Sequence, residues 1–220
     1  MNSFINVLLL VLTLPTMLIA IFVGFDLPVD FLRSTAGRLP YLNEILFGLG
    51  MIMFFISLKR SLRRWMGVRM TKEVAKFKWN TQVSAERKQR VFVYTILESA
   101  VLMSLALGYY FLTPKAWFPA LVMLTFSIEG LIFLFTCQKH LFRIGITSKA
   151  ILVADREVIL IYLSGLRQVS ISQQTVYFDY IQNLQMLFPT DCIEENEREA
   201  FFNTLKESVN RDKVLFKNVD

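Results

Sequence analysis

The sequence predicts a membrane α-helical protein with a folded tail. Its fold class is four transmembrane helices in two hairpins, followed by a C-terminal cytoplasmic α+β domain in which a helix caps an antiparallel β meander. Three observations predict it. Of the 220 residues, 54% are apolar and 20 are Phe. The apolar residues form four long runs, and a bilayer core of about 30 Å requires about 20 such residues in a helix. Short β-rich segments follow the last run.

The apolar runs divide the chain into a transmembrane domain (1–138) and a tail domain (139–220). The first run is longer than the apolar part of a secretory signal and no basic segment precedes it, so an uncleaved helix is favoured over a signal peptide. Pro15 predicts a kink in that helix, and Gly48 and Gly50 predict a close helix approach in the second. Three residues join the last two spans, which must therefore form an antiparallel hairpin. The predicted spans are 4–25, 42–58, 91–113 and 116–138.

A strongly basic stretch lies between the second and third spans. Lys59–Arg90 contains 11 Lys and Arg against two Glu, a balance of +9 in a chain whose net charge is +6. Positive charge in short loops marks the cytoplasmic side of a membrane. The other side carries only Arg33, Arg38 and Lys115. We therefore expect a multi-pass plasma-membrane protein whose N-terminus, basic stretch (59–90) and tail all face the cytoplasm.

The basic stretch also predicts a surface for lipids or for a partner. Both of its halves place aromatic and apolar residues among cations, which is typical of short amphipathic helices in the headgroup layer. RNA and calmodulin-like partners are alternatives for such a pattern. Because two spans hold the stretch at the membrane, we expect anionic lipid headgroups and no nucleic acid. The residues expected to face lipid or partner are Lys59, Arg60, Arg63, Arg64, Trp65, Arg69, Lys76, Lys78 and Trp79.

The tail is nearly neutral and alternates β-rich runs with turn residues. It holds 10 Lys and Arg against 11 Asp and Glu, and its turn-forming separators predict an antiparallel meander. The predicted strands are 141–147, 150–155, 157–163, 168–174, 175–181 and 184–190. A helix follows, for which Asp191 and Glu194 predict a capping box. Helical spacing predicts one apolar face, made by Phe201, Phe202, Leu205 and Val209.

Three segments of the tail carry a resemblance to a known group: ITSKAILVAD, LSGLRQVSIS and VYFDYIQNLQMLFPTDCIEENEREAFFNTLKESV. Six or seven strands closed by an amphipathic helix are the outline of a pleckstrin-homology-like (PH-like) domain. The segments are similar to the YcxB-like C-terminal domain of bacterial membrane proteins, which is PH-like. The Trp expected near LSGLRQV is missing here. The resemblance implies a membrane-tethered cytoplasmic module in the bacterial inner membrane, without catalytic residues or a defined ligand.

Two acids inside the predicted spans form the sharpest candidate site. Glu98 and Glu129 lie about 24 and 22 Å from the turn between their helices, at about 1.5 Å per residue, and hence at nearly the same depth. Acids within spans are functional candidates. If the two carboxylates face each other, repulsion would hold a proton on one of them, which suits proton or cation coupling or a basic partner helix. The alternatives are hydrogen bonds to nearby Ser and Thr, contact with cytoplasmic water, or pairing with a cation of the basic stretch.

Few residues suit catalysis or metal binding. Cys137 and His140 are three positions apart, but no third group is evident to orient a thiol–imidazole pair. His140 is the only histidine and Cys192 the only other cysteine, which excludes multi-histidine metal sites, and we expect both thiols to be free and reduced. Glycine loops for nucleotides and the H-E-x-x-H and G-x-S-x-G motifs are absent. We expect no metal, no cofactor and no catalytic residue.

The sequence favours a non-enzymatic protein as the first of three hypotheses. It would be a scaffold, accessory or regulatory subunit that contacts a lipid surface or another membrane protein complex through its tail and basic stretch. The second hypothesis is a small transporter or ion-coupled subunit that uses Glu98 and Glu129. The third is a lipid-modifying enzyme. Replacing both acids with Gln distinguishes the first two, because a scaffold would lose assembly and a transporter would lose flux.

Overall fold

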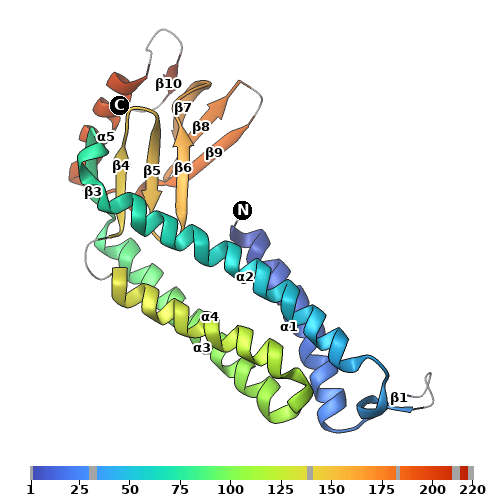
Figure 1. Ribbon diagram of the computed structural model, residues 1–220. Helices are drawn as coiled ribbons and strands as arrows, with labels where there is room; N and C mark the ends of the chain where they lie inside the picture. The colour runs from blue at the N-terminus through green and yellow to red at the C-terminus, as the bar shows by residue number, and fades with distance from the viewer. Residues whose placement is uncertain (1, 30–33, 138–140, 182–183, 210–213, 218–220) are drawn as a thin grey trace. The chain divides into compact units, whose positions relative to one another are not determined.

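The computed structural model describes residues 2–29, 34–137, 141–181, 184–209 and 214–217 (Figure 1). The chain forms two compact units. The first, the helical unit, combines Met1–Leu62 with Tyr94–Phe133, and the second, the sheet unit, combines Arg63–Val93 with Leu134–Asp220. This division differs from the predicted boundary at residue 138, because most of the basic stretch belongs to the sheet unit.

Four helices are long and apolar enough to cross a membrane, as the sequence predicts. They are α1 (Asn2–Gly24), α2 (Leu42–Lys72), α3 (Ala85–Leu112) and α4 (Trp117–Cys137). Two of them extend into the basic stretch. The end of α2 is rich in Arg, Met, Leu and Lys, which favour helix, and α3 begins where the Ser84 hydroxyl accepts a hydrogen bond from the Arg87 amide at 3.2 Å, as an N-cap does.

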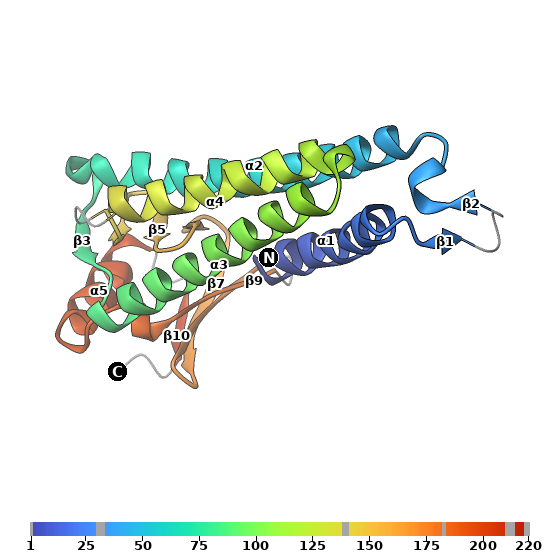
Figure 2. The same ribbon diagram turned by 90° about the horizontal axis from the view of Figure 1, so that it is seen from below.

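The helical unit is held together by close contacts between its helices (Figure 2). A Cβ at Gly50 would lie 2.6 Å from the ring of Phe118, so α2 and α4 approach closely only because this position is Gly, as predicted. At Gly48, by contrast, a Cβ would meet nothing within 4 Å, so the prediction for that residue is wrong. The fully buried Tyr109 of α3 donates a hydrogen bond to the Thr13 carbonyl of α1 at 3.1 Å.

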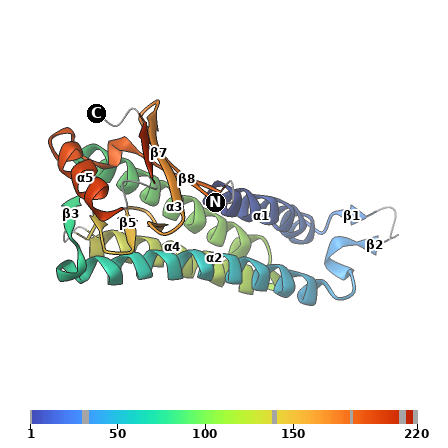
Figure 3. The same ribbon diagram turned by 90° about the horizontal axis from the view of Figure 1, so that it is seen from above.

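Short elements close the end of the helical unit that carries the α1–α2 and α3–α4 connections. Strands β1 (Pro28–Val29) and β2 (Ser34–Thr35) pair antiparallel beyond the end of α1 (Figure 3), and the 3₁₀ turn η2 (Ala36–Arg38) follows them. A second 3₁₀ turn, η4 (Pro114–Ala116), joins α3 to α4. Lys115 of η4 donates to the Gly37 carbonyl at 2.7 Å, which ties the two connections together.

The sheet unit contains two four-stranded sheets. Their orders are β3-β4-β5-β6 and β10-β7-β8-β9, and all neighbours are antiparallel except the parallel pair β10 and β7. The strands are β3 (Trp79–Gln82), β4 (Arg143–Ile146), β5 (Ala150–Ala154), β6 (Val158–Tyr162), β7 (Leu166–Ser172), β8 (Thr175–Tyr180), β9 (Gln185–Pro189) and β10 (Leu215–Lys217). The six predicted strands are confirmed as β4 to β9, whereas β3 and β10 were not predicted.

Strand β3 corrects the interpretation of the basic stretch. The sequence predicts two short amphipathic helices there, but the first is the end of α2 and the second is absent. In its place are the 3₁₀ turn η3 (Val74–Lys76) and β3, which pairs with β4 in the register Trp79 with Ile146 and Gln82 with Arg143. The second half of the basic stretch therefore forms a turn and an edge strand rather than a helix.

The C-terminal helix covers sheet residues with its apolar face, as predicted for Phe201, Phe202 and Leu205, whereas Val209 lies beyond the end of the helix. Helix α5 (Glu195–Ser208) buries Phe201, which contacts the rings of Trp79 and Phe188 at 5.3 and 5.8 Å between centroids. The predicted capping box is wrong. Glu194 is the N-cap without a side-chain hydrogen bond, and Asp191 lies in the preceding 3₁₀ turn η5 (Thr190–Cys192), where its carboxylate pairs with an arginine of α3.

Candidate functional site

The two predicted intramembrane acids lie in a polar layer of the helical unit that α2 completes. Glu98 of α3 forms an ion pair with Arg60, and Glu129 of α4 accepts a hydrogen bond from the Ser61 hydroxyl at 3.0 Å. Because Arg60 and Ser61 are consecutive residues of α2, both acids meet that helix at about the same level. We call these four residues the polar layer.

The polar layer gives each carboxylate its own partner on α2. Pairing of an acid with a cation of the basic stretch was one of the predicted alternatives, and it holds for Glu98. Of the hydroxyls considered as partners, Ser127 instead donates to the Ser99 carbonyl at 2.7 Å and Thr125 to the Leu121 carbonyl at 2.8 Å. These bonds join or stiffen α3 and α4.

Shielding by protein makes the ion pair of the polar layer structurally important. The side chain of Arg60 is 8% exposed and that of Glu98 is 19% exposed, so little solvent reaches either charge. In a low-dielectric setting, a guanidinium and a carboxylate each need the other to offset desolvation. The pair therefore fixes α2 against α3, and Ser61 adds a contact to α4.

The basic stretch divides into buried and exposed members. Arg60 and Arg64 are buried, so these two do not form the lipid-facing surface that the sequence predicts. Trp79 is half-buried and contacts Phe201. Arg63 and Trp65 are half-buried. The exposed members are Lys59, Arg69, Lys76 and Lys78.

Two further arginines at the start of α3 hold acids of the sheet unit. Arg87 donates to the Asp155 carboxylate from Nε at 3.1 Å and from Nη2 at 2.8 Å. Arg90 donates to Asp191 at 2.9 Å. The charge count of the basic stretch includes both arginines but predicts no partner for either. The two arginines are three residues apart, which places both guanidiniums on one face of the helix. This spacing could have indicated that they share a contact surface.

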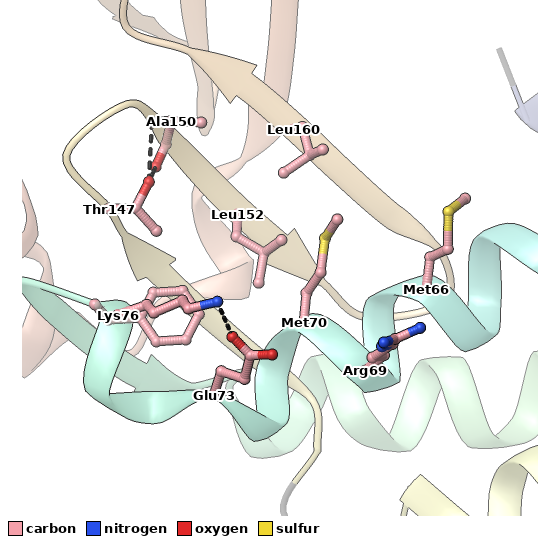
Figure 4. A pocket seen from close by; sticks show the side chains of 10 residues that line it. Met66, Arg69, Met70, Glu73, Lys76, Thr147, Ala150, Leu152 and Leu160 are labelled. Atoms are coloured by element: carbon pink, nitrogen blue, oxygen red, sulfur yellow. Dashed lines mark hydrogen bonds and ion pairs between the residues drawn. The ribbon is translucent and has the colours of Figure 1, made fainter.

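A pocket of about 450 Å³ lies within the sheet unit, between the end of α2 and the first sheet (Figure 4). We call it the α2–sheet pocket. Its wall is mostly apolar and its rim carries three charged side chains from the basic stretch. The lining residues are Met66, Arg69, Met70, Glu73, Lys76, Phe77, Thr147, Ala150, Leu152 and Leu160.

Local contacts shape the α2–sheet pocket. Phe77 lies so close to Gly145 of β4 that a side chain there would collide with the ring. At Gly67 of α2 a Cβ would come within 3.3 Å of Val158, so this glycine permits the approach of α2 to β6. At the rim, Lys76 forms an ion pair and hydrogen bond with Glu73, which lowers the pKa of that carboxyl.

Cys192, the thiol whose side chain the structure describes, is not placed to react. Cys192 is fully buried, and burial raises the pKa of its thiol to about 12, so it stays protonated at neutral pH. His140 lies outside the described residues, as does the side chain of Cys137, so the predicted pair of these two is not tested. Within the described part of the chain, no group of three His, Cys, Asp or Glu side chains is placed to hold a metal ion.

Comparison of the chain with protein-family models, with curated proteins and with solved structures finds no match. The resemblance to the YcxB-like group therefore stays a prediction that rests on the residue pattern of the tail.

Proposed function

We propose that this chain is a non-enzymatic integral membrane protein of the bacterial inner membrane that serves as a scaffold, accessory or regulatory subunit. Its four apolar helices cross the bilayer, both termini are cytoplasmic, and the sheet unit is a PH-like domain of the YcxB-like type. That domain and the exposed part of the basic stretch contact a lipid surface or another membrane protein complex.

The observation that carries this proposal is the pairing of β3 with β4. With β3 included, seven strands in two sheets precede α5 within the described residues, which is the outline of a PH-like domain. Because β3 lies between α2 and α3, the domain is built from two separate chain segments, each joined directly to apolar helices. A domain anchored at several points suits presentation to a partner at the membrane better than release into the cytoplasm.

The polar layer favours the scaffold over the alternative transporter. An ion-coupled site needs a carboxylate that exchanges a proton or cation during its cycle. Glu98 is engaged by the buried Arg60, and Glu129 accepts a bond from Ser61. These contacts join three helices, which supports a role in assembly.

A co-purification experiment tests the proposal. The full-length tagged protein is extracted in a gentle detergent, and co-purifying membrane proteins are quantified by mass spectrometry for the wild type and for the Glu98→Gln/Glu129→Gln double variant. We expect reproducible partners that the double variant loses. Retained partners together with lost ion flux in reconstituted vesicles would favour the transporter and contradict the scaffold.

Membrane topology is tested separately. Reporter enzymes that act only on one side of the membrane are fused after residue 220 and inserted beside Gly37. We expect cytoplasmic activity from the first fusion and periplasmic activity from the second, and the reverse pattern would refute the proposed orientation.

A further inference from the structure

The α2–sheet pocket has the size and flexibility of a site for a linear apolar group. Its volume of about 450 Å³ falls within the range of small-molecule sites, about 300–1,000 Å³. Met66 and Met70 lie one turn apart on α2 and project toward Leu152 and Leu160 of the sheet (Figure 4). The two methionines are 46% and 39% exposed, so part of each side chain is open to a ligand. Unbranched thioether side chains adjust readily to a flexible ligand.

The rim of the pocket carries Arg69, Lys76 and Glu73, which together have a net charge of +1. Glu73 and Lys76 neutralise each other through their ion pair. Among the residues that the structure describes, Arg69 makes no ion pair or hydrogen bond. Its charge acts on Glu73 at longer range, but its hydrogen-bond donors are open to a ligand with one negative charge next to a hydrocarbon chain. A phosphodiester has this charge, and its oxygens accept paired hydrogen bonds from guanidinium.

The chain connection keeps the pocket near the source of such a ligand. Met66 follows Lys59, the first basic residue after the predicted span, by seven residues. Even a fully extended segment of that length reaches only about 25 Å. If α2 crosses the bilayer, as proposed above, the pocket always lies within reach of the headgroup layer, where phospholipid is the most abundant amphiphile.

We propose that the α2–sheet pocket binds one anionic phospholipid of the bilayer, with an acyl chain between Met66, Met70 and the sheet and with the headgroup phosphate on Arg69. This inference rests on the proposed membrane location. It makes the sheet unit responsive to the anionic lipid content of the membrane, because the ligand joins the end of α2 to β5 and β6.

Titration with short-chain lipids tests this proposal on the full-length protein in detergent. Native mass spectrometry measures the stoichiometry and Kd for dioctanoyl phosphatidylglycerol, for dioctanoyl phosphatidylcholine and for glycerol phosphate. We expect one phosphatidylglycerol per chain. Phosphatidylcholine and the chain-free glycerol phosphate should each bind at least about tenfold more weakly, because one lacks net charge and the other lacks apolar contact. Equal binding of either control compound would overturn the assignment.

Paired variants distinguish lipid binding at the α2–sheet pocket from general electrostatic attraction to the basic stretch. Arg69→Gln should raise the Kd for phosphatidylglycerol about tenfold. Lys72→Gln removes the same charge from the same helix at an exposed position that does not line the pocket, and it should change the Kd much less. Equal effects would show a diffuse electrostatic interaction and refute the site. Met70→Trp should block binding by filling the pocket.

A measurement on the wild type covers the case in which Met70→Trp does not fold. A photo-activatable phosphatidylglycerol with the reactive group on its acyl chain should label peptides that contain residues 66–77 or 150–160. Labelling confined to other segments would overturn the proposal. Loss of partner co-purification alone would leave lipid binding intact, so failure of the scaffold function and failure of the pocket assignment are distinguishable.

Discussion

Removal of Arg60 should destabilise the helical unit far more than removal of its neighbour Lys59. The guanidinium of Arg60 is almost fully shielded by protein and pairs with Glu98. Lys59 carries the same charge one residue earlier on α2 but is exposed. Arg60→Met and Lys59→Met therefore remove equal formal charge from the same helix in opposite environments.

The expected magnitude follows from what each substitution leaves behind. Arg60→Met leaves the Glu98 carboxylate, which is 19% exposed, without its cation. Breaking a buried pair by deleting one member costs about 3–5 kcal/mol of the free energy of unfolding. An exposed substitution such as Lys59→Met stays within about 0.5 kcal/mol. Replacing both members, as in Arg60→Met/Glu98→Gln, removes both charges of the pair and should recover most of the loss.

The measurement is a double-mutant cycle on the purified full-length chain. Unfolding by SDS titration in mixed micelles, followed by far-UV circular dichroism, gives the free energy for the wild type, both single variants and the double variant. We expect the double variant to be less destabilised than the sum of the single variants by several kcal/mol. Additive losses, or an Arg60→Met variant as stable as Lys59→Met, would refute the ion pair as a structural contact.

Three further predictions concern packing, burial and the anchoring of α3. Gly50→Ala should lower the free energy of unfolding by about 1–3 kcal/mol, because the added methyl group overpacks against a ring of α4. Gly48→Ala should raise it by up to about 1 kcal/mol through helix propensity. Equal effects in the same SDS titration would contradict the close approach of α2 and α4. Cys192 should react with iodoacetamide only after unfolding, and rapid labelling under native conditions, detected by mass spectrometry, would argue against its burial. The pKa of this thiol is about 12 in the folded state and about 8.5 in the unfolded state. Its contribution to the free energy of unfolding should therefore be complete below about pH 8.5 and should fall as the pH rises toward 12. Arg87→Met should lower the free energy of unfolding by about 1.5–3 kcal/mol through the loss of charged hydrogen bonds to Asp155. Amide hydrogen exchange should rise in the first turns of α3. Unchanged exchange would show that the contact does not anchor the helix.

Local patterns were sufficient to predict most elements. Four apolar runs, helix-breaking residues and turn signals place the helices and the strands β4 to β9 close to their observed ranges. The apolar face of α5 was also predicted, because its spacing depends on the helix alone. The turn between β7 and β8 falls at Gln173 and Gln174, both with positive φ, which were predicted as the last two residues of a strand.

Elements that depend on distant partners were not predicted. The four residues of β3 contain no apolar alternation strong enough to distinguish them from an amphipathic helix, and only β4, far along the chain, makes them a strand. The three residues of β10 likewise pair in parallel with β7 across α5. The partners of charged residues likewise depend on segments far apart in the sequence. A count over Lys59–Arg90 does not say which cation has a partner, whereas the structure shows that Arg60 and Arg87 pair with acids from remote segments.

The pairing of β3 with β4 also has a consequence for biogenesis. The ribosome synthesises β3 first, and both α3 and α4 must be made before β4 appears. Until then β3 has no strand to pair with, and unpaired strand edges favour aggregation. The synthesis of α3 and α4 thus determines when the first sheet of the sheet unit can be completed. A tail expressed without residues 79–82 would expose β4 as an edge and leave Phe201 without the ring of Trp79.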